Sequence, residues 1–142
     1  MDSWKRSFLD KLHQAQARCI KQFEAALHDA VEPVVDEFTG FLRDNGFRVS
    51  SPLNEQGRRS FKFELAENAY LLMIFRFSGV GEFELRSEVF VPGQEPQLNK
   101  TVCRIPDVNE AWAQRQFREG LESLVAQLAG ESREVAEELA AV

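Results

Sequence analysis

The sequence predicts an α+β domain, in which one antiparallel sheet is preceded and followed along the chain by long helices. Hydrophobic residues recur at helical spacing before residue 46, alternate with period two between residues 60 and 91, and return to helical spacing after residue 107. Short turns separate the predicted strands, and such turns connect antiparallel neighbours. The 142 residues fit a single domain with a helical part, a sheet part, a helix, and a short helix or tail, which are residues 1–46, 47–106, 107–130 and 131–142.

The N-terminal helix is predicted over residues 3–31, because apolar side chains recur there every three or four positions. Asp2 or Ser3 can cap it by accepting a free backbone N–H. Pro33 has no N–H for a helical hydrogen bond, so we expect a kink or break near Val31–Pro33. The apolar stripe consists of Trp4, Phe8, Leu12, Ala15, Cys19, Phe23, Ala26 and Ala30.

The length of this first helix has a consequence for packing. About 29 residues at 1.5 Å each span roughly 43 Å, which is longer than a strand of a small sheet. The helix must therefore overhang the sheet, pack on another copy of the chain, or bend back. A second helix follows and ends at Asn45-Gly46, since glycine readily adopts the left-handed conformation of a C-terminal cap.

Four or five strands are predicted in the middle of the chain. Residues 60–66 and 82–91 alternate between apolar and charged side chains, which indicates strands with one buried face. Residues 69–77 are apolar on both faces and predict a central strand. Residues 47–50 and 99–105 predict a short first strand and a last one, and Ser78–Gly81 reads as a turn.

The C-terminal helix is predicted to begin at Asp107. Glu110 follows three residues later, as in a capping box, and Pro106 precedes it. Gly130 ends the helix. The predicted buried stripe consists of Trp112, Phe117, Leu121, Leu124, Val125 and Leu128.

The charge and composition of the chain argue against some classes of binding partner. The formal net charge of −6 makes phosphate-rich partners unfavourable, so we expect neither nucleic acid nor an anionic membrane. The longest apolar run has seven residues and is too short to cross a bilayer. Two isolated cysteines, Cys19 and Cys103, and the lack of a secretory leader predict a cytoplasmic protein.

No residue pattern predicts a cofactor or a metal. Gly79-Val80-Gly81 follows an apolar strand, but a dinucleotide loop needs a third glycine where Glu84 stands, and a helix where the next strand begins. These glycines therefore predict a hairpin loop. His13 and His28 lie too far apart on one helix to share a metal, and no catalytic nucleophile has a histidine at a recognisable spacing.

Two further charged groups are interpreted as surface features. Glu24, His28 and Glu32 lie four residues apart and can share one side of the helix, which we interpret as a solvated face rather than metal ligands. Arg58, Arg59 and Lys62 form a basic cluster that can bind one anion, although a solvated hairpin edge is the favoured interpretation.

The second face of the sheet carries an unexpected apolar patch. Tyr70, Leu72 and Ile74 point away from Leu71, Met73 and Phe75, and Phe90 lies on the same side. A patch with a polar rim is covered by a helix or meets a partner. We predict an interface that includes Phe8 of the first helix, and a rim that consists of Lys62, Glu64, Arg76, Arg86 and Glu88.

Two classes of function follow from these observations. The favoured one is a non-catalytic protein-interaction module, adaptor-like or chaperone-like, which self-associates as a homodimer and has room for another protein partner. The alternative is a small-ligand-binding protein or enzyme with a pocket between sheet and helices, where Arg76 or Arg86 meets an acidic ligand. No family is recognised; the outline resembles secretion-chaperone-like folds in architecture alone, so no residue is carried over from them.

Overall fold

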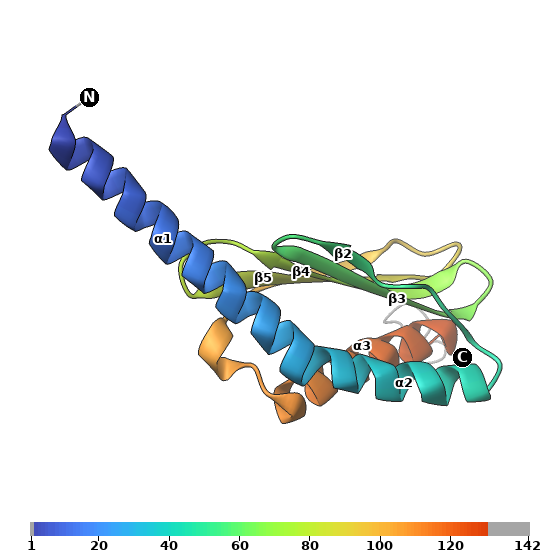
Figure 1. The fold of residues 1–142 in the computed structure, drawn as a ribbon. Helices are drawn as coiled ribbons and strands as arrows, with labels where there is room; N and C mark the ends of the chain where they lie inside the picture. Colours follow the sequence, from blue (N-terminus) through green and yellow to red (C-terminus); the bar gives the residue numbers. More distant parts are fainter. Residues whose placement is uncertain (1, 131–142) are drawn as a thin grey trace.

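The computed structural model describes residues 2–130 and confirms an α+β fold with an antiparallel sheet between N-terminal and C-terminal helices (Figure 1). The strands form one sheet, and the described helices lie on one side of it. The elements are α1 (Ser3–Ala26), the π-helical segment η1 (Leu27–Val31), α2 (Glu32–Asp44), β1 (Arg48–Val49), β2 (Leu53–Glu55), β3 (Arg58–Ala66), β4 (Ala69–Phe77), β5 (Glu82–Phe90), β6 (Gln97–Arg104), the 3₁₀ turn η2 (Ile105–Asp107) and α3 (Glu110–Leu128).

The N-terminal helix bends where the sequence predicts a kink. Figure 1 shows α1 and α2 running in different directions, with η1 between them. In η1 the N–H of Glu32 donates to the carbonyl of Leu27, five residues back, and Pro33 then occupies the first turn of α2, where a missing N–H costs least. At the other end, the side chain of Asp2 accepts the Trp4 N–H at 3.0 Å, as predicted for a cap.

The sheet is antiparallel throughout and has the strand order β1-β3-β4-β5-β6, with β2 also paired to β3. β4 is central, as predicted, and its register places Leu71 beside Phe63 and Val89. The sequence predicted four or five strands, and β2 is the one that it missed. Its three residues are all exposed, so they carry no apolar alternation.

The core lies between the sheet and the helices and is rich in phenylalanine. Phe117 of α3 is fully buried, and its ring contacts those of Phe61, Phe63 and Phe75 at centroid distances of 5.8 to 6.1 Å. Phe23, the one buried residue of α1, packs on the β5 residue Phe83 at 5.4 Å. Burying each such ring contributes roughly 1.5–3 kcal/mol, so this layer holds the helices on the sheet.

The predicted start of the C-terminal helix was wrong by three residues. Asp107 ends the turn η2 instead of capping α3. The cap is Asn109, which has an extended backbone and accepts the Trp112 N–H at 2.7 Å through its side chain. Gly130 follows the helix with a φ of 72°, as expected of a terminating glycine. The predicted short helix or tail at 131–142 lies outside the described residues.

Candidate functional site

The face of the sheet that points away from the helices is the first candidate site, and we call it the open face. Its apolar patch contains the four sheet residues predicted from the alternation. Tyr70 and Phe90 are cross-strand partners with ring centroids 5.5 Å apart, and Leu72 and Ile74 continue the row along β4. The Nζ of Lys62 lies 4.5 Å from the centre of the Tyr70 ring. Because α1 lies on the opposite side of the sheet, it does not cover this patch (Figure 1).

Three cations surround one carboxylate on the same face. Glu84 is only 3% exposed, and its Oε2 accepts a hydrogen bond of 2.8 Å from Arg76 on the neighbouring strand. Arg86 binds the other oxygen, and the Nζ of Lys100 on β6 lies 3.6 Å from Oε2. Arg76 and Arg86, which were predicted from the sequence to bind an anionic ligand, therefore both bind a carboxylate of the protein itself, Glu84. Positive charge still exceeds negative charge in this cluster.

Sequence reasoning missed the role of Glu84, although a signal was present. Arg76 and Glu84 are cross-strand neighbours, and Arg86 lies two residues further along β5 on the same face. Hydrogen bonds from Arg76 and then from Arg86 lower the pKa of Glu84 to about 2, while burial opposes the shift. The carboxylate is therefore ionised at neutral pH and holds the cations together.

Acid should remove the stabilising contribution of Glu84 over a defined pH range. Because the pKa is lower in the folded chain, this contribution is complete above about pH 4.5 and is lost as the pH falls toward 2. We expect urea unfolding of wild type and Glu84→Gln to converge across this range, since a protonated glutamate is as neutral as glutamine. A stability difference between the two proteins that does not change with pH would contradict this prediction.

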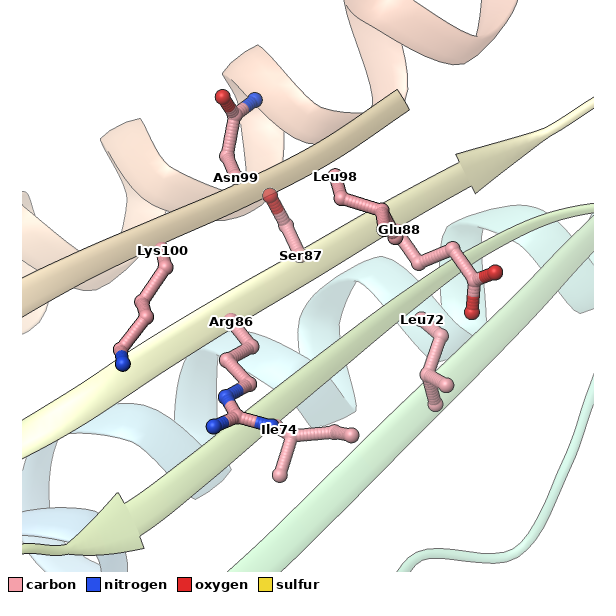
Figure 2. A pocket seen from close by; sticks show the side chains of 8 residues that line it. All are labelled: Leu72, Ile74, Arg86, Ser87, Glu88, Leu98, Asn99 and Lys100. Atoms are coloured by element: carbon pink, nitrogen blue, oxygen red, sulfur yellow. The ribbon is translucent and has the colours of Figure 1, made fainter. Parts of the chain in front are cut away.

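A shallow hollow of about 360 Å³ lies beside the cation cluster on the open face. Figure 2 shows the side chains of Leu72, Ile74, Arg86 and Lys100 extending from the same side of three neighbouring strands. Leu98 of β6 completes the apolar part of the wall, and 73% of its surface is exposed. The hollow thus combines apolar side chains with two cations, Arg86 and Lys100, and one carboxylate, Glu88.

The alternative prediction placed a pocket between the sheet and the helices, with Arg76 or Arg86 inside it. A smaller hollow of about 210 Å³ does lie between the sheet and α3, where Glu119 contributes the charged side chain. Arg76 and Arg86 lie on the other face of the sheet, so they do not reach it. That part of the alternative was wrong, because the alternation along β4 and β5 directs both arginines outward.

The projecting half of α1 is the second candidate site, and we call its apolar row the α1 stripe, consisting of Trp4, Phe8, Leu12, Ala15 and Cys19. Figure 1 shows this end of α1 extending beyond the sheet. Trp4 is 67% exposed and Phe8 is 52% exposed, and their rings stack at 5.6 Å. Phe8 therefore does not share a surface with the patch on the open face. The predicted interface residues form two separate surfaces.

A buried arginine explains the charged row on the helix. Arg59, which is 9% exposed, points toward the helices and donates to Glu24 at 2.8 Å and also to Glu32. Glu24 accepts the Gly57 N–H at 3.0 Å, and the Nδ1 of His28 lies 2.9 Å from Glu32. The solvated interpretation was wrong for Arg59, Glu24 and Glu32, since β3 directs Arg59 inward between the two carboxylates. It holds for His28, whose side chain is 76% exposed. This network ties β3 to the bend of the N-terminal helix.

The two loop glycines and Cys103 show no feature of a cofactor-binding or catalytic site. Gly79 and Gly81 have φ values of 155° and 78° and lie in the loop that joins β4 to β5, as a hairpin requires. Burial raises the pKa of the Cys103 thiol, and Asp107 raises it further, which is opposite to the shift of an activated nucleophile. Residues 2–130 contain no group of three or more histidine, cysteine or acidic side chains placed to hold a metal ion.

Neither the character of the helices nor similarity to known proteins assigns a function to the chain. None of the helices in residues 2–130 combines the length and apolar character that crossing a bilayer requires. Comparisons of the chain with protein-family models, curated proteins and solved structures found no match. The open face and the α1 stripe are therefore the two surfaces that bear on function.

Proposed function

We propose that this chain is a non-catalytic protein-interaction module that forms a homodimer through the α1 stripe. One observation carries the proposal: two stacked aromatic side chains, Trp4 and Phe8, lie exposed on a helix that extends beyond its own domain. Aromatic side chains bury 150–250 Å² each, at about 25 cal/mol per Å². Covering this stripe with a second copy would therefore stabilise the assembly by several kcal/mol before the entropic cost of association.

The helix itself also favours a partner. Between Ser3 and Arg18, its side chains are exposed or at most half-buried, so the body of the domain contributes little to its stability. A helix segment of about 15 residues without tertiary contacts is marginal in water. A second copy would supply those contacts, and closed twofold dimers are the commonest solution in soluble proteins.

Charge on α1 sets the salt dependence that this dimer should have. Residues 3–22 contain five basic side chains and one acidic side chain, Asp10, although the whole chain has a net charge of −6. Two such helices repel each other, and salt screens the repulsion between exposed charges. The apolar contribution is larger, since like-charge pairs on a helix surface cost only about 0.2–0.5 kcal/mol each. Association should thus strengthen as salt is added.

Mass measurement in solution tests the proposal. We expect light scattering across a dilution series to give a dimer mass at high micromolar concentration, and a monomer mass on dilution. The dissociation constant should fall when salt is raised from about 0.05 M to about 0.5 M, where the screening length shortens several-fold. A monomer mass at every concentration would refute self-association, and a dimer that weakens with salt would point to a charge-driven interface elsewhere.

The open face is the second surface of the proposed module and the place for a different protein partner. It also keeps the ligand-binding alternative open in a changed form, because the hollow has apolar walls and two cations, Arg86 and Lys100, against one carboxylate, Glu88. A small acidic ligand would bind there and not between sheet and helices.

Cys19 and Cys103 are both free, which supports the cytoplasmic location proposed from the sequence.

A further inference from the structure

The two edges of the sheet are built differently. At one edge β3 is paired with two short strands, β1 with two residues and β2 with three. At the other edge β6 has eight residues and pairs with β5 in an unbroken register from Glu82–Arg104 to Val89–Gln97. Within residues 2–130, no strand is paired with the outer side of β6.

A long regular edge strand can pair with another chain. Proteins usually prevent this with short strands, bulges, proline or charged side chains at the edge. β6 contains no proline, and its register with β5 shows no bulge. The protecting feature in its centre is one cation, Lys100. Its backbone can therefore accept a further strand, provided that the side chains of that strand suit Lys100 and its neighbours.

The side chains of β6 on the open face alternate between apolar and cationic. Leu98 and Val102 are 73% and 60% exposed, and Lys100 lies between them. Lys100 is 3.6 Å from Glu84, but that carboxylate already accepts hydrogen bonds from Arg76 and Arg86. Lys100 can therefore interact with a second carboxylate, and one brought by a neighbouring strand would reduce the local excess of positive charge.

We propose that β6 binds an extended segment of another protein that carries an apolar, an acidic and an apolar side chain at alternate positions. Backbone hydrogen bonds along β6 would supply affinity, and alternate side chains would supply specificity. The apolar residues would lie beside Leu98 and Val102, and the acidic one beside Lys100. The same pattern fits parallel and antiparallel addition, because it reads identically in both directions.

A second copy of β6 is the less suitable occupant. An antiparallel pair of β6 strands that places Leu98 opposite Val102 also places the two Lys100 side chains opposite each other. Like charges directly opposite on a sheet are destabilising, whereas an acidic residue opposite Lys100 is stabilising. The inference is therefore independent of the dimer proposed through α1.

Synthetic peptides test this inference on the full chain. One probe is an extended peptide with a Val-Thr-Glu-Thr-Val centre, and the matched control has lysine in place of glutamate. We expect the glutamate peptide to bind about tenfold more tightly than the lysine peptide, and to slow amide hydrogen exchange along β6. Lys100→Met changes an exposed side chain and leaves the core intact. The glutamate and lysine peptides should bind this variant with about equal affinity. Lys62→Met on the same face should preserve the preference for the glutamate peptide.

Each result bears on the proposal. Absence of saturable binding at millimolar peptide, equal binding of both peptides to wild type, or exchange protection away from β6 would overturn it. Repeating the titration with Phe8→Glu separates the two proposals. If the peptide still binds this variant, the β6 site is supported, whether or not the chain dimerises through α1. If peptide binding is lost together with the dimer, the peptide occupies the α1 interface and the β6 site is refuted.

Discussion

Replacing Phe8 by glutamate should convert the dimer to a monomer while leaving the domain folded. Phe8 is 52% exposed and stacks on Trp4, away from the core. In a twofold dimer the substitution occurs twice, and an interfacial aromatic hot spot is worth at least about 2 kcal/mol. The dissociation constant should therefore rise on the order of a thousandfold. Light scattering gives the mass, and thermal unfolding followed by circular dichroism shows whether the domain remains cooperative.

The first helix offers a matched control for this variant. Ala17 is exposed and lies nine residues after Phe8, which places it two and a half turns away on the opposite side of α1. Ala17→Glu adds the same charge to the same helix and should leave the dimer intact. Leu72→Glu tests the open face. If Leu72→Glu dissociates the assembly and Phe8→Glu does not, the dimer forms through the sheet and the proposed interface is wrong.

Loss of Arg59 should cost more folding stability than loss of any other ion-pairing side chain in the described residues. Arg59→Met would leave Glu24 and Glu32 facing each other without the cation that now lies between them. Breaking a buried pair costs about 3–5 kcal/mol, and the side chains of Glu24 and Glu32 are 31% exposed and can regain some water. We expect a loss of about 3 kcal/mol in the free energy of unfolding by urea.

Two further variants isolate the electrostatic cause of that loss. Arg59→Lys keeps the charge but cannot bind two carboxylates through a planar fork, so its stability should fall between wild type and Arg59→Met. Adding Glu24→Gln and Glu32→Gln to Arg59→Met removes the unpaired negative charges and should recover part of the stability. If this combination is no more stable than Arg59→Met alone, packing of the arginine stem and not charge explains its effect.

Local patterns in the sequence were sufficient for most of the fold. Helical spacing located α1, and the geometry of Pro33 located the bend that follows it. The period-two segments matched β3, β4 and β5 closely, because alternation arises from the strand backbone itself. The strand β2 and the cap at Asn109 were missed. β2 has no apolar side chain facing the core, and two capping sequences overlap between Asp107 and Asn109.

The sequence by itself determined which residues share a face, and the tertiary structure decided what meets that face. Tyr70, Leu72, Ile74 and Phe90 were grouped correctly from alternation alone. β4 is apolar on both sides, however, so the pattern of this strand alone does not show which side the helices cover. That choice depends on the complete packing of Phe23 and of α3 against the sheet.

The same distinction applies to the charges. Arg59 meets partners that precede it by 35 and 27 residues, and Lys100 of β6 meets Glu84 of the neighbouring strand β5. Spacing along the chain carries no information about such distant pairs, because the register of the sheet and the bend at η1 bring them together. The sequence therefore determined that α1 carries an amphipathic stripe, and only the tertiary structure decided that half of this stripe has no cover within its own domain. Phe23, three residues before the end of α1, is the one buried residue of this helix, and the turns that precede it extend beyond the sheet.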